Sequence, residues 1–241
     1  MPAREFDYPN GERNATVRAF TNPAVEKDLH AFTLIELFVV IGVIAILLSL
    51  AFPVFNTVQE KARVAQDLNN LRQLGIATQT YLNDNDETLF SSDATVVWMK
   101  SLHPKYLPNW KIFQSPFDKR ASSEDDAIAP VSYGFNGNSV LGLSSDTIAR
   151  PSAFILIAPT QTTASTVSFS GNPSNSVTVY KASSVPGGTA IGGTHNHRTR
   201  INALFADLHV DSLTWSDFLL DQDVSNSQAD ANFRWDYAGH L

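Results

Sequence analysis

Cysteine is absent from the sequence, and so is any segment rich in lysine and arginine. The lack of cysteine excludes disulfides, thiolate metal sites and cysteine nucleophiles. With 17 Lys and Arg against 24 Asp and Glu, the net charge is −7, and the basic surface typical of nucleic-acid-binding proteins is missing. We therefore expect no nucleic-acid partner for this chain.

The motifs of several large enzyme classes are absent too. The chain has no Gly-x-Ser-x-Gly, no phosphate-binding glycine loop and no His-Glu-x-x-His. Nucleophilic and nucleotide-dependent chemistry therefore lack support, and we expect a protein that is not an enzyme. A length of 241 residues suits one globular domain with appendages.

What the sequence does contain is one long apolar segment. Residues 31–55 read AFTLIELFVVIGVIAILLSLAFPVF, and every residue from Leu37 to Phe52 is apolar, glycine or serine. About 20 such residues form a helix that is long enough to cross a bilayer. A secretory signal is instead cleaved behind a shorter apolar centre, and Ser49-Leu50-Ala51 resembles such a cleavage site. Hydropathy alone leaves both interpretations open.

One carboxylate, Glu36, lies near the start of this segment. A carboxylate deep in a bilayer costs about 2.5–3.5 kcal/mol, so it tends to be kept for a function. The stretch Phe32-Thr33-Leu34-Ile35-Glu36-Leu37, followed by an apolar helix, resembles the processing site of the type IV prepilins and the pseudopilins of type II secretion. In that family a prepilin peptidase cuts before the apolar segment, methylates the new amine, and leaves the segment attached as an anchor.

The resemblance assigns a role to each matching residue. It implies cleavage between Ala31, where the family usually has glycine, and Phe32, whose new amine is methylated. That amine would pair with Glu36 of a neighbouring subunit during assembly, and Pro53 matches a proline that kinks the helix. The alternative for Glu36 is a carboxylate that simply lies at the level of the lipid headgroups.

The implied partners are the prepilin peptidase, other pilin or pseudopilin subunits, the lipid bilayer, and an inner-membrane assembly platform with its ATPase. The implied location is the bacterial inner membrane, crossed once, with the C-terminal domain in the periplasm, and then a periplasmic or cell-surface filament. A large head and a long tail favour a minor subunit. Pilus and secretion pseudopilus remain open as alternatives.

A second helical pattern follows Pro53, which bends or ends the first helix. Its apolar and small residues recur at spacings of three or four: Val58, Ala62, Ala65, Leu68, Leu71, Gly75, Thr78 and Leu82. We expect an amphipathic helix over 56–83 that packs on a small sheet. The turn-forming residues 83–87 end it, and Asp84 and Asp86 there allow calcium as an alternative to a solvated helix end. Otherwise no cofactor is expected.

Beyond residue 90 the apolar runs are short and are separated by Gly, Pro, Asn and Ser, which favours strands joined by loops. The predicted strands are 95–99, 153–158, 166–170, 176–180, 201–206 and 209–215. The fold class is therefore α+β and pilin-like: a long N-terminal helix, half membrane-spanning and half amphipathic, packed on a small antiparallel sheet. The predicted parts are a leader at 1–31, a transmembrane assembly segment at 32–55, an amphipathic helix at 56–83, a head at 84–215 and a tail at 216–241.

Parts of the chain between about residues 32 and 215 resemble a subgroup of prepilin-like proteins that carries His-x9-Asp-Gly near its C-terminus. The matching segments are LNNLRQLG at 68–75, NDND at 83–86, SYGFNGN at 132–138 and the stretch from His197 to Val210. Two cysteines that such relatives often carry, near Asp67 and Ser115, are both absent. Leu208 replaces the glycine of a tight hairpin turn, and a left-handed leucine costs about 1–2 kcal/mol. We expect the hairpin to survive with a shifted or wider turn.

Four residues near this motif suggest an alternative function. If His195 and His197 lay on one strand and Asp207 and His209 on its neighbour, alternate side chains would share one face and suit zinc or iron. The chain would then be an anchored or secreted binding domain that uses a pilin-like signal for export. The aromatic residues of the tail favour packing on the sheet, with a partner subunit as the alternative.

Overall fold

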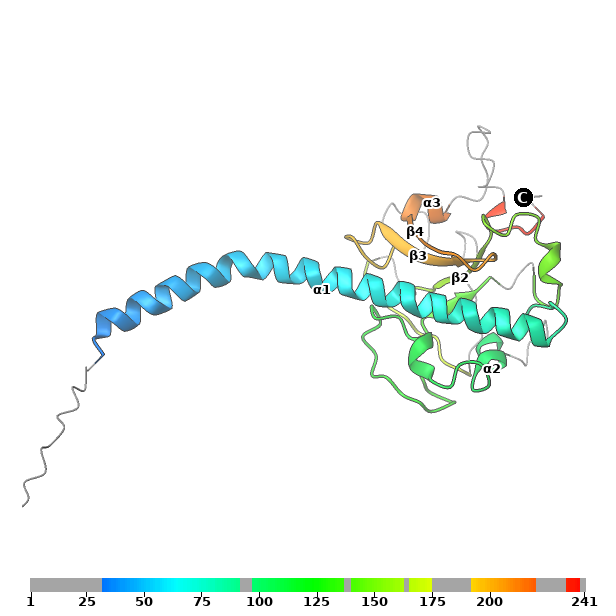
Figure 1. Ribbon diagram of the computed structural model, residues 1–241, viewed down its shortest axis with the longest axis horizontal. Coiled ribbons are helices and arrows are strands. Elements are labelled where there is room, and N and C mark those ends of the chain that lie inside the picture. Colours follow the sequence, from blue (N-terminus) through cyan, green and yellow to red (C-terminus); the bar gives the residue numbers. More distant parts are fainter. Residues whose placement is uncertain are drawn as a thin grey trace, which may run out of the picture. The chain divides into compact units, whose positions relative to one another are not determined.

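The computed structural model describes residues 32–91, 97–136, 140–162, 165–174, 192–219 and 233–238 (Figure 1). The predicted leader at 1–31 and the predicted strand at 176–180 lie outside these ranges, as do the side chains of residues 51 and 53. The chain divides into two compact units, Met1–Ser49 and Leu50–Leu241. The first contains the start of the apolar helix, and the second contains the head.

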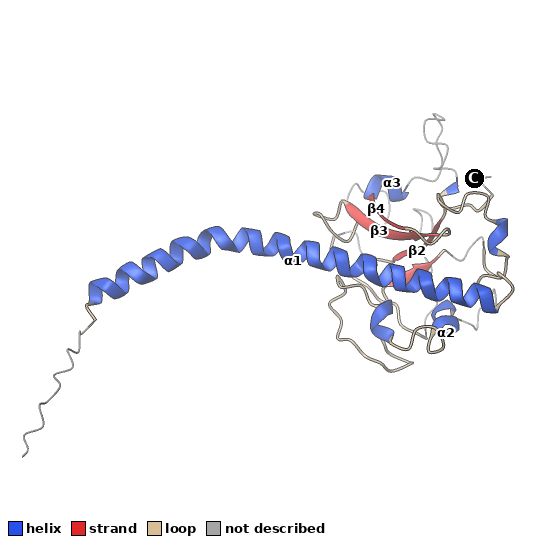
Figure 2. Cartoon of the chain, viewed as in Figure 1, coloured by secondary structure: helices blue, strands red, loops and turns tan. Residues whose placement is uncertain are grey.

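The longest element is the helix α1, Leu34–Asp84 (Figure 2). It ends where the turn-forming residues begin, because Asp86 and Glu87 both have positive φ and the N–H of Glu87 bonds back to the carbonyl of Leu82 at 3.0 Å. The predicted helix end at 83–87 is confirmed.

Four strands form one antiparallel sheet, in chain order: β1 (Tyr133–Phe135), β2 (Ile155–Pro159), β3 (Arg200–Phe205) and β4 (Val210–Thr214). The pairing of β3 with β4 is regular from Arg200↔Thr214 to Leu204↔Val210. The α+β class with a small antiparallel sheet is therefore confirmed, and the predictions at 153–158, 201–206 and 209–215 match β2, β3 and β4.

The strands β1, β2 and β3 are largely buried on both faces, because their side chains alternate between two cores, whereas the side chains of the edge strand β4 are half-buried or exposed. Leu204 packs with Leu71 and Leu74 of α1, together with a cluster of aromatic rings from the segments around α2 (Trp98–Leu102). Ala203 and its neighbours on the other face pack with α3 (Trp215–Leu219) and with the buried Trp235. The head thus has three layers, and the described part of the tail contributes to the third.

Two predicted strands are wrong. The segment 95–99 ends inside α2, whose Trp98 and Met99 are buried, and residues 166–170 carry no strand among the described residues. Periodicity cannot separate a short buried helix from a short buried strand, which explains the first error. The strand β1 was not predicted, since glycine and asparagine interrupt its segment. The described residues also contain two short 3-10 helices, Trp110–Phe113 (η1) and Ser145–Thr147 (η2).

The buried face of α1 starts later than the spacing of apolar residues predicts. Leu71, Gly75, Thr78 and Leu82 are buried, but Val58 is 57% exposed, and Ala62 and Ala65 are exposed as well. Burial begins at Asp67, a charged residue that the predicted apolar stripe did not include.

The hairpin between β3 and β4 survives the replacement of glycine by Leu208, as predicted. Leu208 has φ of 69°, whereas Asp207 does not have positive φ, so the turn is not the tight type that needs both. The N–H of Leu208 bonds to the carbonyl of Phe205 at 2.9 Å, and the N–H of Phe205 bonds to the carbonyl of His209 at 2.9 Å. A β-turn followed by one left-handed residue gives the wider loop.

Candidate functional site

The start of α1 is closed by a reciprocal pair of hydrogen bonds between Thr33 and Glu36. The Oε2 atom of Glu36 accepts from the Thr33 N–H at 2.8 Å and from the Thr33 hydroxyl at 2.6 Å, and the Glu36 N–H donates to that hydroxyl oxygen at 3.3 Å. This is a capping box, in which the side chains at the N-cap and at the third helical residue satisfy each other's backbone N–H groups. The carboxylate therefore has a structural role within its own chain.

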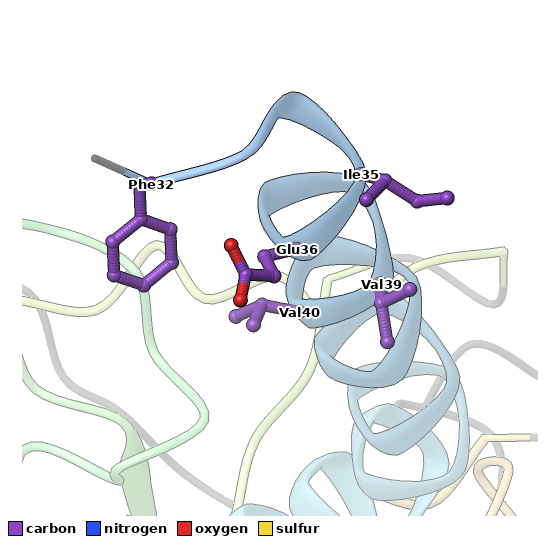
Figure 3. A pocket seen from close by; sticks show the side chains of 5 residues that line it. All are labelled: Phe32, Ile35, Glu36, Val39 and Val40. Atoms are coloured by element: carbon purple, nitrogen blue, oxygen red, sulfur yellow. The ribbon is translucent and has the colours of Figure 1, made fainter. Parts of the chain in front are cut away.

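The surroundings of Glu36 are otherwise apolar and open. Its carboxylate lies beside the ring of Phe32, in a shallow pocket of about 330 Å³ that Ile35, Val39 and Val40 complete (Figure 3). Within the described residues, Thr33 is the one hydrogen-bond partner of the side chain, and it engages Oε2 alone. The other oxygen, Oε1, is therefore open to a donor from another molecule.

Apolar side chains are exposed along the whole first half of α1. Of the large apolar side chains that are exposed in the described residues, all but Ile76 and Ile128 lie between Phe32 and Val58. Soluble monomeric proteins rarely expose a contiguous apolar surface of this extent. The segment therefore requires a lipid or protein environment that covers it.

A test of membrane spanning by length and hydropathy gives a mixed result. Among the described residues, no single helix is both long and apolar enough to satisfy the criteria. The bent pair of segments Leu34–Leu50 and Val54–Asp84 satisfies them when the two are taken together. The two parts join within α1 at residues 51–53, and this stretch contains Pro53, the residue predicted to bend or end the helix. A signal sequence near an N-terminus would meet the same test.

In the head, the most polar buried cluster surrounds Asp67 of α1, which is 0% exposed. Its Oδ1 atom accepts from the hydroxyls of Ser115 at 2.6 Å and Tyr133 at 2.7 Å, and its Oδ2 atom accepts from the side-chain amide of Asn202 at 2.8 Å. Burial raises the pKa of Asp67, and the three donors offset part of this rise. The cluster joins α1 to β1, to β3 and to the segment after η1.

The side chains at 67 and 115 are in direct contact, because the hydroxyl of Ser115 donates to Asp67. This hydrogen bond links two segments that lie 48 residues apart in the sequence. Because Asp67 contacts two strands as well, one buried carboxylate fixes the helix against the sheet at several points.

His195 is the one predicted metal candidate that is buried. Its ring contacts the hydroxyl of Thr194 at 3.1 Å and that of Ser212 at 3.2 Å, and it stacks on Phe117 with centroids 5.8 Å apart. Burial, together with the positive charge of Arg200, lowers the pKa of His195 to about 4. Both ring nitrogens have partners, so His195 is a neutral part of the packing between β4 and the segment around Phe117.

We expect the stability of the head to depend on pH through His195. Unfolded, the imidazole binds a proton near its ordinary pKa of about 6.5, whereas in the head it does so only near 4. Between these values the unfolded state binds more protons, so the free energy of unfolding falls as pH is lowered, by up to about 3 kcal/mol. Urea unfolding in mild detergent, followed by tryptophan fluorescence, measures this. The His195→Gln variant should show a flatter profile, and equal slopes in both proteins would contradict the assignment.

The other metal candidates do not join His195. His197 is exposed in a left-handed turn before β3, whereas Asp207 and His209 pair with each other at the far end of that strand. Six residues at about 3.3 Å each place the two ends of β3 roughly 17 Å apart. The ligand set behind the alternative of a binding domain is thus not assembled, and no group of three or more His, Asp or Glu side chains suited to a metal occurs in the described residues.

The acidic residues at the end of α1 also have ordinary structural roles. Asp84 pairs with the ammonium of Lys105 at 2.8 Å and accepts from the hydroxyl of Tyr106 at 3.0 Å. These two donors lower the pKa of Asp84. Asp86 takes positive φ in the turn that ends the helix.

The sequence interpretation missed two features that carry recognisable signals. The capping box is visible as the pattern Thr-x-x-Glu at 33–36, immediately before an apolar run. Asp67 lies one helical turn before Leu71 and so falls on the buried face, where a lone carboxylate requires partners. Those partners come from residues 48 to 135 positions further along, which no local pattern indicates.

Comparison of the chain with protein-family models, with curated proteins and with solved structures gives no match.

Proposed function

We propose that the chain is a structural subunit, of the minor type, of a type IV pilus-like or type II secretion pseudopilus filament. A prepilin peptidase removes residues 1–31 and methylates the amine of Phe32. The apolar segment first anchors the protein in the inner membrane. It then packs with the same segment of other subunits in the filament core, and the heads lie outside. This proposal rests on the resemblance of residues 32–37 and on the physical features of α1.

The observation that carries the proposal is the exposed apolar surface between Phe32 and Val58, which begins beside a single carboxylate. Lipid covers such a surface before assembly, and the equivalent helices of neighbouring subunits cover it afterwards. Because both environments are apolar, the segment keeps most of its contacts with apolar groups when it moves from the lipid into the filament. An anchor of this kind therefore suits a protein that leaves the membrane to assemble.

The geometry of Glu36 supports a pairing role. Its Oε2 atom is committed to Thr33, and its Oε1 atom remains open. After cleavage at Ala31, the amine of Phe32 carries a positive charge at the same end of the helix. The Glu36 of one subunit and the Phe32 amine of the next then neutralise each other within an apolar core, where either charge alone is costly.

Assembly of this kind needs an external source of energy. No phosphate-binding loop occurs in the sequence, so a separate assembly ATPase at an inner-membrane platform drives extraction of the subunit. The work of this chain is packing, with Glu36 as the counter-charge and Pro53 as the point where the helix adapts.

Electron microscopy of material sheared from cells tests the proposal. Filaments that bind an antibody against the head are the expected result, and they should be absent from cells that lack the prepilin peptidase. Protein found only in the membrane or the medium, with no labelled filament, would contradict the proposal. Fractionation of the same cells locates the protein in each case.

A further inference from the structure

Two exposed isoleucines remain unexplained by the membrane anchor. Ile76, on the outer face of α1, is 69% exposed, and Ile128, on the loop between η1 and β1, is 67% exposed. All other large exposed apolar side chains of the described residues belong to the segment from Phe32 to Val58. Within the described residues, the two isoleucines are therefore the large apolar contact points on the surface of the head.

Ile76 borders an open groove of about 630 Å³ between α1 and the tip of the β3–β4 hairpin. Arg72 lies one turn earlier on the same face, and Leu208 and Val210 form the opposite wall. No acidic side chain of the described residues pairs with Arg72. A second groove, on the other side of Ile76, contains Lys105, whose charge is already matched by Asp84 at 2.8 Å. The first groove therefore combines an apolar wall with an available positive charge.

Ile128 is presented by a loop that is held firmly at its base. The backbone N–H of Trp110 donates to Glu124 at 2.7 Å, and its indole N–H donates to Asp126 at 2.7 Å. Between these two anchors lies Asp125, whose Oδ1 atom accepts from the N–H of Ala127 at 2.8 Å. Within the described residues no cation pairs with Asp125. The loop thus offers an apolar side chain and a free negative charge in a fixed arrangement, which lowers the entropy cost of binding.

We propose that the loop 123–128 of one copy docks into the groove beside α1 of the next copy, with Ile128 against Ile76 and Asp125 opposite Arg72. None of the residues that line the groove belongs to the loop. The contact therefore joins two different surfaces and propagates from copy to copy instead of closing a dimer. It deepens the proposed function, and it rests on that function for the alignment of the copies.

The contact is small and does not by itself hold two copies together. When the apolar segments hold copies side by side, the effective concentration of one head near the next reaches about the millimolar range, and weak contacts become populated. The expected result is a contact between heads that depends on the anchors and that sets the spacing of successive heads.

Engineered cysteines test the contact, and the absence of native cysteine gives a clean background. The full-length double variant Ile76→Cys with Ile128→Cys is oxidised in membranes and in sheared material. The expected product is a ladder of disulfide-linked trimers and larger species. The matched control pairs Ile76→Cys with Ala121→Cys, an exposed position earlier in the same segment, and should give no species beyond dimers.

The outcomes separate this inference from the proposed function. Labelled filaments without a ladder would overturn the head contact and leave the filament proposal intact. A ladder in membranes without filaments would support the contact and overturn the filament proposal. The absence of both would overturn both.

A charge exchange tests the orientation of the contact. In the double-cysteine background, Asp125→Lys or Arg72→Glu alone should lower the yield of the ladder by about two- to fivefold. The combination of both should restore it, because the ion pair is rebuilt with reversed sign. If the two changes together lower the yield of the ladder by the product of their separate fold-decreases, Asp125 does not face Arg72.

Discussion

Replacing Glu36 with valine is expected to abolish filament assembly while the head remains folded. In the proposed filament, the variant would remove the counter-charge and leave the amine of Phe32 alone in the apolar core. Loss of one partner of a buried ion pair costs about 3–5 kcal/mol, which corresponds to a drop of roughly a hundredfold or more in an association constant. The amount of labelled filament in sheared material measures the effect. Tryptophan fluorescence reports separately on the head, because all four tryptophans are buried there.

The capping box requires a control for this experiment. Glu36→Gln keeps a side chain that also closes a capping box, so the start of α1 is preserved and only the charge is lost. Thr33→Ala has the opposite effect, because it removes the cap and keeps the carboxylate. We expect Glu36→Gln to fail in assembly and Thr33→Ala to succeed. If Glu36→Gln assembles normally and Thr33→Ala does not, Glu36 acts through the helix start and not through its charge.

Replacing Asp67 with alanine is expected to destabilise the head by about 3–5 kcal/mol, since it leaves three buried donors without an acceptor. These donors are the hydroxyls of Ser115 and Tyr133 and the amide of Asn202. A single domain is typically stable by only about 5–15 kcal/mol, so much of the head's stability is lost. Urea unfolding of the full-length protein in mild detergent, followed by tryptophan fluorescence, gives the difference. A change below about 1 kcal/mol would contradict this role.

The matched variant Asp67→Asn should be far milder. The new amide nitrogen would face the side-chain amide of Asn202, whose Oδ1 atom has no hydrogen-bond partner among the described residues. Rotation of the Asn202 amide by half a turn would present that oxygen as an acceptor. We therefore expect a loss of about 1 kcal/mol or less. A loss as large as that of Asp67→Ala would show that the negative charge itself is required.

The two Asp67 variants also differ from the native protein in their pH dependence. Burial raises the pKa of Asp67, so above the unfolded value near 3.8 the folded state binds more protons than the unfolded state. This contribution to stability is fully present below that value and is lost as pH rises through the folded pKa. It is opposite in sign to that of His195, whose pKa is lowered. Variants at 67 and 195 separate the two contributions.

Local patterns were sufficient to predict part of this fold. The spacing of apolar residues predicted a helix over 56–83 with one buried face, and Asn83 to Glu87 predicted its end, although burial begins only at Asp67. Both signals lie within a few residues of the structure that they determine. The strands β2, β3 and β4 were predicted for the same reason, because they are apolar runs bounded by turn residues.

The remainder depends on contacts between distant segments. Whether Trp98 belongs to a helix or a strand is decided by the aromatic core that it enters, with ring centroids 5.8 Å from those of both Phe90 and Phe113. The separation of His195 from Asp207 follows from where β3 begins. The environment of Asp67 forms only when β1, β3 and the segment after η1 all contact α1. The spacing of residues in the sequence does not indicate such contacts between distant segments.

The intact mass and N-terminal fragment spectrum of the protein, recovered from membranes and from sheared surface material, test the central claim most directly. Our account predicts a chain that begins at Phe32 with one added methyl group on its amine, in both fractions. A chain that begins at Met1 would leave the leader in place, so no free amine would be available to Glu36. A chain that begins at Phe52 would indicate an ordinary secreted domain. Either of these results would contradict processing and assembly as a filament subunit.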